Sequence, residues 1–520
     1  MVTLYQSEKL KTDKEVAKKT AKHEYFVGLL RNSADAVPEN ALIAAFLKDS
    51  ASLAAVNEKL AGEKAKPTDK ITFMVGDGLL VDDVRVHEWW RKYRTADTED
   101  GAGEGKMRCL LTGEMVTPLE THPKIKGLGI VGGQSAGSVL IGFDKDAFCS
   151  YGLKQSANAV VSEAAAKVYQ TALNDIVRKG KKLANTMILN WYKETVPDED
   201  DPLPFLLAYE DDERTQEIAA SQLIKRVLDS IHSGERADLA NNRYYSMVVS
   251  GAGGRVMVRE WLENDFVNVA RNIGVWFDDL AIVSNDGSRT AKDPKLYSIL
   301  FSLVTDSREV KQETKDSLVT ILAAKLLRCA VNNEPIPATA IARAVLRIRA
   351  DITDPDKPLS PARMSLIKAY HLRKNAKKGG EDLSERIAIE LNPYFDNVPY
   401  QLGRLMAVLA RLQRSALGDV GAGIVERFYA AASMTPNLVF GRLTRLSQFH
   451  LNKLEKPLAI WYENTIADIW SKVTGKIPNM LSVEEQSLFA MGYYQQIAYM
   501  RSGKAKEVTP SAEENRATDA

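Results

Sequence analysis

The chain is poor in cysteine and histidine for its length, and it lacks any long apolar run. Its 520 residues include only three cysteines, Cys109, Cys149 and Cys329, which are widely separated and form no C-x-x-C pair. This pattern argues against a disulfide framework and gives no support for a zinc site. No apolar run reaches the roughly 18 residues that a membrane helix needs, and the first residues lack an apolar signal segment. We therefore expect a soluble cytoplasmic protein without a metal or other cofactor.

The net charge of +1 hides an uneven distribution of charged residues. Residues 325–378 hold twelve basic and four acidic residues, so this segment carries about +8 and the remainder about −7. Such segregation is typical of a surface that binds a polyanion, although a merely solvated basic face would give the same pattern. The candidate contacts in this segment are Arg343, Arg347, Lys368, Arg373 and Lys374.

A glycine-rich stretch at residues 127–143 permits two interpretations. Gly133-Gln-Ser-Ala-Gly137 fits the G-x-S-x-G pattern of a serine hydrolase, in which Ser135 would be the nucleophile. That pattern needs a helix directly after the serine, whereas residues 138–143 read as a strand. The downstream histidines, His232, His371 and His450, lie in polar or basic settings that do not suggest a buried orienting carboxylate. The hydrolase interpretation is therefore the weaker one, and no catalytic residue is predicted.

The favoured interpretation is a flexible glycine and serine loop that joins two strands. Its backbone amides could approach a ligand or a phosphodiester closely, and the lysines just before it favour an anionic partner. The candidate nucleic-acid contacts here are Lys124, Lys126, Gly132, Gly133, Gln134, Ser135 and Ser138.

Apolar periodicity and turn residues predict an α+β fold, with a strand-containing N-terminal region followed by a C-terminal helical bundle. We expect amphipathic helix up to about residue 65, then strands at 71–75, 109–116, 128–131 and 139–143, with a flexible loop at 97–106. Residues 156–195 are predicted to be helical. The acidic runs at 198–201 and 210–213 are predicted to form a solvated linker. Residues 244–250 and 255–259 read as a hairpin with a glycine-rich turn, before a helix that carries Trp261.

From about residue 290 the pattern is helical, and prolines fall between the periodic segments. The predicted domains are therefore 1–290 and 291–500, with a disordered tail at 501–520. In the helix after Pro399, leucines form one stripe and three arginines cluster within about 80° opposite it. A helix at about 440–456 repeats this arrangement. These two cationic ridges, suited to a phosphate backbone, consist of Arg404, Arg411 and Arg414, and of Arg442, Arg445, Lys453 and Lys456.

Several blocks of the sequence, in order, resemble the large subunit of the type I-C CRISPR surveillance complex (Cascade), the Cas-eight-c family. The resemblance covers most of the chain from about residue 20. The blocks that carry it are 109–114, 122–127, 133–152, 242–261, 272–280, 366–370, 402–405 and 435–450. Members of this family usually begin with a further segment rich in aromatic residues and asparagine, which does not precede His23 here.

The resemblance implies a non-catalytic DNA-binding subunit. It would recognise the protospacer-adjacent motif (PAM) in duplex DNA, help to open the duplex, stabilise the R-loop and recruit a helicase-nuclease. Its partners would be CRISPR RNA, the Cascade backbone subunits and target DNA. The resemblance also implies a small subunit, made from the same gene by internal initiation, that would correspond to the bundle from about residue 400. Two alternatives to a Cascade subunit stay open: a serine hydrolase that uses Ser135, and a nucleic-acid-binding scaffold outside CRISPR.

Overall fold

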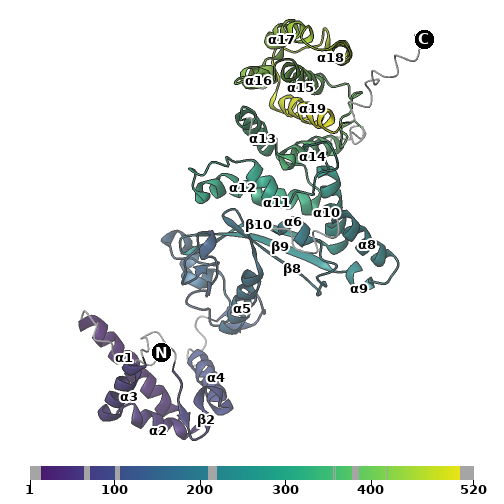
Figure 1. Cartoon of the computed structure of the whole chain (residues 1–520). Coiled ribbons are helices and arrows are strands. Elements are labelled where there is room, and N and C mark those ends of the chain that lie inside the picture. The colour runs from purple at the N-terminus through teal and green to yellow at the C-terminus, as the bar shows by residue number, and fades with distance from the viewer. Residues whose placement is uncertain are drawn as a thin grey trace. The chain divides into compact units, whose positions relative to one another are not determined.

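The computed structural model describes residues 13–63, 71–99, 106–208, 220–354, 357, 359–377, 386–418 and 420–503. The chain divides into two compact units, one comprising residues 1–120 and 156–163 and the other residues 121–155 and 164–520 (Figure 1). Side chains on both sides of residue 290, such as Leu280 and Ile299, share one buried cluster in the second unit. The domain boundary near residue 290 stays a prediction, and most of the predicted tail lies outside the described residues.

The first unit is mainly helical. Its elements are α1 (Asp13–Asn32), α2 (Glu39–Phe46), α3 (Ser50–Gly62), α4 (Val84–Glu99) and the two-residue strands β1 (Met74–Val75), β2 (Gly78–Leu79), β3 (Met107–Arg108) and β4 (Met115–Val116). Val27, Ile43 and Leu47 form part of a small core between α1 and α2. The predicted continuous helix is thus divided into three, because a turn that ends at Pro38 separates α1 from α2. Most of the predicted loop at 97–106 lies outside the described residues.

A six-stranded sheet organises the first part of the second unit. Its strand order is β5-β6-β10-β9-β8-β7, and its members are β5 (Lys124–Ile125), β6 (Ser138–Val139), β7 (Lys181–Leu183), β8 (Thr186–Tyr192), β9 (Arg243–Ala252) and β10 (Arg255–Asp265). The predicted hairpin is confirmed as β9 and β10, and its second strand is long enough to include Trp261. The helix predicted over 156–195 is wrong beyond α5 (Glu163–Lys179), because β7 and β8 follow.

Each face of this sheet carries a core. Ile188, Val248 and Leu262 pack into the large cluster shared with α8 (Ala220–His232) and α10 (Phe266–Leu280). On the other face, Leu189 and Met247 pack with Val177 of α5. A strand buried on both faces shows no alternation in its sequence, so periodicity could not identify β8.

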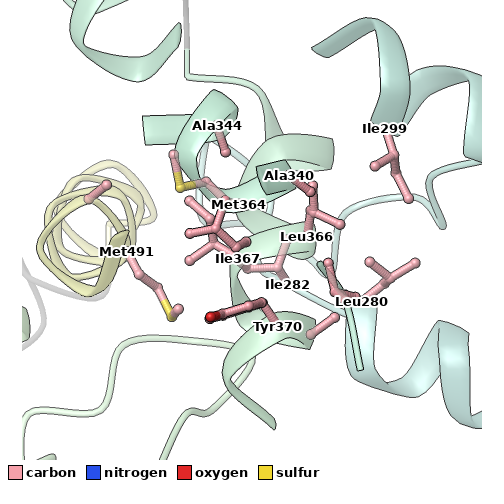
Figure 2. Packing of buried hydrophobic residues seen from close by; sticks show 14 of the residues in the cluster. Leu280, Ile282, Ile299, Ala340, Ala344, Met364, Leu366, Ile367, Tyr370 and Met491 are labelled. Carbon is pink, nitrogen blue, oxygen red and sulfur yellow. The ribbon is translucent and has the colours of Figure 1, made fainter. Parts of the chain in front are cut away.

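Helices form the rest of the second unit, which confirms the α+β class and the C-terminal bundle. They are α11 (Leu296–Ser302), α12 (Gln312–Asn332), α13 (Ala338–Asp351), α14 (Pro361–Lys377), α15 (Val398–Leu417), α16 (Ile424–Met434), α17 (Pro436–Leu451), α18 (Lys456–Val473) and α19 (Val483–Arg501). Figure 2 shows how α14 joins the sheet region to the bundle: Leu366 lies on the side of Leu280, while Ile367 and Tyr370 lie on the side of Met491 of α19.

Helix α15 is the centre of the bundle and contacts α16, α17, α18 and α19. It approaches α19 closely because each helix has a glycine at the crossing. A Cβ atom on Gly403 would lie 1.9 Å from the Phe489 carbonyl oxygen, and one on Gly492 would lie 2.0 Å from the Tyr400 carbonyl oxygen. As a result, every residue from Pro399 to Leu409 is buried.

Candidate nucleic-acid interface

The glycine loop is held by close backbone contacts with the β9–β10 hairpin. A Cβ atom on Gly132 would lie 2.9 Å from the Gly251 carbonyl oxygen, and Gly133 forms a bridge to Gly253. The segment before the loop is a short 3-10 turn (Gly129–Val131), so the strand predicted at 128–131 is wrong. The loop's glycines therefore allow close packing, and they leave little room for larger side chains at Gly132 and Gly133.

Ser138 lies inside this loop structure and not on its surface. Its side chain is fully buried, accepts a hydrogen bond from the Gln134 amide at 3.1 Å and lies 3.4 Å from the Gly253 carbonyl oxygen. The prediction that Ser138 contacts nucleic acid conflicts with this burial. Gln134 and Ser135 are instead exposed at the loop tip.

The surface near the loop offers two exposed lysines. Lys124 lies in β5 and Lys126 follows it directly, and both are exposed. The nearby Arg255 forms an ion pair with Asp144, so its charge is partly compensated. The exposed set of Lys124, Lys126, Gln134 and Ser135 is called the loop surface below.

Ser135 has none of the surroundings of a catalytic serine. The short strand β6 follows it, where a nucleophile elbow requires a helix. In the described part of the chain no hydrogen bond joins Ser135 to a histidine, and His371 instead contacts Ser487 on α19 at 2.7 Å. The geometry gives the hydrolase interpretation no support.

Basic side chains of α14 bind the C-terminal ends of three other helices. The Lys368 ammonium donates to the Asp279 carbonyl of α10 at 3.0 Å, and the Arg363 guanidinium donates to the Ser302 carbonyl of α11 at 2.6 Å. Cations are favourable there because the last carbonyls of a helix lack intrahelical partners and carry partial negative charge. Burial lowers the pKa of Lys368, which is only 4% exposed.

Arg373 binds the C-terminal end of α12 in the same way. Its guanidinium donates to the Cys329 carbonyl at 2.6 Å and pairs with the Asp279 carboxylate at 2.7 Å. It also stacks over the Trp276 ring, 4.9 Å from its centroid, and it is 5% exposed. Lys368 and Arg373 were predicted to contact nucleic acid, and burial overturns both predictions. Charge counting cannot separate cations that join helices from cations that face a ligand.

The other candidate contacts of residues 325–378 form ion pairs within the protein or are half-buried. Arg347 pairs with Asp351 within α13, and Lys374 pairs with Glu484 of α19. Arg343 is half-buried on α13. The candidates Arg347, Lys368, Arg373 and Lys374 are therefore all engaged in contacts within the protein.

The ridge predicted on α15 is shorter than the sequence suggested. Arg404 is 3% exposed, because it lies in the half of α15 that the other helices surround. The prediction that Arg404 is part of an exposed ridge is therefore wrong. Arg411 and Arg414 are exposed, and with Arg501 of α19 they line a cavity of about 530 Å³.

The ridge on α17 keeps two of its cations. Arg442 and Arg445 are exposed, and the Arg442 guanidinium lies 5.5 Å from the centroid of the Phe428 ring. The helix ends at Leu451, so the predicted continuous helix at 440–456 is wrong. Lys453 is exposed but lies in the turn before α18, outside the α17 ridge.

Three features of the described chain were not predicted from the sequence. Arg501 joins the cationic set although it lies about 90 residues from Arg411 in the sequence. Trp89 and Tyr93 of α4 stack with ring centroids 5.0 Å apart, and the run Trp-Trp-Arg-Lys-Tyr at 89–93 was a visible signal. Trp191 stacks on Tyr245 across β8 and β9 at 5.7 Å, which only the strand pairing brings together.

Two carboxylates of the predicted acidic linker form contacts within the protein. Asp200 is buried and pairs with Arg236, and Asp201 accepts a hydrogen bond from the Tyr192 hydroxyl at 2.6 Å. Residues 198–201 are therefore not simply a solvated linker, and 210–213 lie outside the described residues.

Across the described ranges, no group of three or more His, Cys, Asp or Glu side chains is placed to hold a metal ion. Within the same ranges, no helix combines the length and apolarity needed to span a bilayer.

A family model described as "CRISPR-associated protein (Cas_Csd1)" matches residues 5–500. The chain therefore belongs to the Cas_Csd1 family, and it is a component of a Cascade-type complex. This match confirms the resemblance seen in the sequence blocks. No curated protein matches the chain.

Proposed function

We propose that this chain is the non-catalytic large subunit of a type I-C Cascade complex in the cytoplasm. In this role it contacts PAM-proximal duplex DNA, stabilises the R-loop and recruits the helicase-nuclease that degrades the target. Its partners are the CRISPR RNA and the backbone subunits of the complex. Pairing between guide and target carries most of the sequence specificity, and the protein binds mainly shape and backbone.

The observation that supports this proposal best is the group of exposed arginines on the bundle. Arg411 and Arg414 on α15 and Arg442 and Arg445 on α17 come from two helices that pack against each other. Arginine binds phosphate oxygens through charge-assisted, often bidentate hydrogen bonds. A phosphate backbone bound in this way needs no particular sequence, which suits a displaced DNA strand.

The loop surface is the second part of the proposal. Gln134 and Ser135 are polar and exposed on a tightly packed loop, and Lys124 and Lys126 add positive charge beside it. A fixed loop loses less conformational entropy on binding than a flexible one would. We assign this surface to the duplex next to the PAM.

Copurification tests the central assignment. The full chain with a C-terminal tag is expressed with a CRISPR array and the backbone subunits encoded beside it, and the bound RNA is sequenced. We expect guide RNA and backbone subunits in the purified complex, and binding of a matched duplex only when the PAM is present. Purification of the chain without guide RNA would contradict the assignment.

The same tagged strain tests for a small subunit that corresponds to the bundle. A separate bundle needs a start before Asn397, because the Asn397 side chain accepts a hydrogen bond from the Tyr400 amide at the first turn of α15. A start at Met406 would also remove Gly403 from its contact with α19. An immunoblot should show a short tagged band that disappears when the internal ribosome-binding sequence is silently recoded.

A further inference from the structure

A cavity of about 480 Å³ with both polar and apolar walls lies between α15, α18 and α19. Segments around Val283–Gly287 and Glu390–Pro393 complete its wall. This volume is in the range of small-molecule sites, which hold a few polar groups among apolar and aromatic ones. Its lining includes Arg404, which was predicted to be on the outer surface.

Two largely buried side chains, Arg404 and Gln496, have unused hydrogen-bond donors at this cavity. The Arg404 guanidinium donates through Nε to the Gln496 side-chain oxygen at 3.0 Å and through Nη1 to the Gln401 side-chain oxygen at 2.7 Å. Nη1 also donates to the Pro393 carbonyl at 3.2 Å. Within the described chain, neither Arg404 Nη2 nor Gln496 Nε2 has a hydrogen-bond partner. Both residues line the cavity, and Gln496 is 1% exposed.

The charge of Arg404 is not compensated by a direct ion pair. No carboxylate among the described residues lies within 4.0 Å of its guanidinium, and Asp468 on the cavity wall pairs with Lys472 at 2.7 Å. Burial lowers the pKa of Arg404, yet an arginine in a protein keeps its proton. Asp468 acts on Arg404 only through its longer-range charge, so a buried cation without a direct ion pair is left, and an oxygen acceptor with negative charge would offset the cost of burying it.

The remaining wall favours a planar ligand. Trp461 and Tyr499 supply aromatic rings, and Asn464 supplies a further amide. The Gln495 amide on the same wall is already engaged, because it donates to the Ala388 carbonyl at 2.8 Å and accepts from the Tyr400 hydroxyl at 2.6 Å. Gln495 thus fixes the wall, whereas Gln496 and Arg404 are available to a ligand.

We propose that this cavity binds one unpaired nucleotide, with a phosphate or base oxygen at Arg404 and Gln496 and the base against an aromatic ring. Unpaired bases are commonly stacked on aromatic side chains and hydrogen-bonded at their edges. The nucleotide comes either free from solution or from a strand held on the bundle. Only the second source rests on the proposed function.

The test uses the full chain and the variant Gln496→Glu. This change keeps the oxygen that accepts from Arg404, removes the free amide donors and places a carboxylate against the guanidinium. The fold should be retained, while the cavity loses its attraction for an anionic ligand. Gln222→Glu on the exposed side of α8 is the matched control, because it adds the same charge at a position away from the cavity.

Deoxynucleoside monophosphates are titrated calorimetrically, and single strands with one 2-aminopurine are titrated by fluorescence. We expect Gln496→Glu to weaken nucleotide binding about tenfold or more, and Gln222→Glu to change it less than twofold. Equal binding by inorganic phosphate and by nucleotides would mean a simple anion site and overturn the nucleotide assignment. Unchanged binding by Gln496→Glu, or no binding of any nucleotide, would overturn the proposal.

The two proposals can fail separately. If arginine substitutions on α15 and α17 leave strand binding unchanged while Gln496→Glu abolishes mononucleotide binding, the cavity stands and the strand path does not. If the arginine substitutions weaken strand binding and Gln496→Glu changes neither ligand, the strand path stands and the cavity proposal is wrong.

Discussion

The backbone of Gly251 lies directly against the backbone of Gly133, so that a Cβ atom at position 251 would fall 1.9 Å from the Gly133 amide nitrogen. This contact joins the end of β9 to the glycine loop. It holds Gln134 and Ser135 at the surface. It also explains why Gly133 and Gly251 are glycines: the two backbones pack closely, whereas the sequence alone suggested flexibility.

Gly251→Ala should destabilise the protein because neither backbone can move without breaking strand pairing. We expect a loss of about 1–3 kcal/mol in the free energy of unfolding, measured by denaturant titration. Gly441→Ala on α17 is the control, since a Cβ atom there meets nothing within 4 Å. That control should be neutral or stabilising by up to about 1 kcal/mol. Equal effects of the two variants would show that the loop and hairpin are not packed as described.

Charge reversal of Lys124 and Lys126 should weaken binding of PAM-proximal duplex without lowering stability, because both side chains are exposed. Gel-shift titration of the assembled complex measures the effect, and about a fivefold or larger loss is expected for two phosphate contacts at moderate salt. Ser135→Ala should change little, and a fluorophosphonate probe should not label Ser135. Labelling of Ser135 would revive the hydrolase interpretation.

Arg373→Gln should impair folding and not DNA contact. The change removes the ion-pair partner of the half-buried Asp279 carboxylate and the side-chain hydrogen bond that links α14 to the Cys329 carbonyl, which should cost about 3–5 kcal/mol. Thermal denaturation measures the loss. At a temperature where the variant remains folded, the salt dependence of DNA binding should equal that of the unchanged chain, and a reduced slope would place Arg373 at the nucleic acid.

His371 should make stability depend on pH. Burial lowers its pKa to about 4 from 6.5, and its Nε2–H donates to Ser487, whose hydroxyl donates to the Glu484 carbonyl. The unfolded chain therefore binds more protons between these values, so stability is full above pH 6.5 and falls as pH drops toward 4. Between pH 7 and pH 5 the histidine should account for about 2 kcal/mol of lost stability.

His371→Gln keeps a donor for Ser487 and removes this titration. The nearby charges are Lys374 and Glu484, and hydrogen bonds from Lys374 and Tyr370 lower the pKa of Glu484. The pKa of Glu484 therefore lies below its ordinary value of 4.5, outside the range between pH 7 and pH 5. The free energy of unfolding of the variant should depend less on pH between 7 and 5, and an undiminished dependence would mean that other groups cause it.

The sequence predicted the elements whose signals are local. The β9–β10 hairpin follows from Gly251–Gly254 between two apolar runs, and α15 follows from its leucine stripe. Strand β8 was missed because both of its faces are buried. Arg404 was misplaced because a helical wheel assumes one solvent face, whereas the glycines at the α15–α19 crossing bring a second helix over that side. The cavity that contains Arg404 could not be predicted, since its walls come from segments far apart in the sequence.

The salt dependence of target binding tests the central claim most directly. Complexes with the native chain and with Arg411, Arg414, Arg442 and Arg445 changed to glutamate are titrated with matched target DNA over a range of salt concentrations. Lys225→Glu, at an exposed position of α8 outside the proposed sites, serves as the comparison. If the four arginines hold phosphates of the displaced strand, the slope of log affinity against log salt should fall by about 0.7 for each lost contact, with weaker R-loops. An unaltered slope, with complexes that assemble and bind normally, would contradict the account.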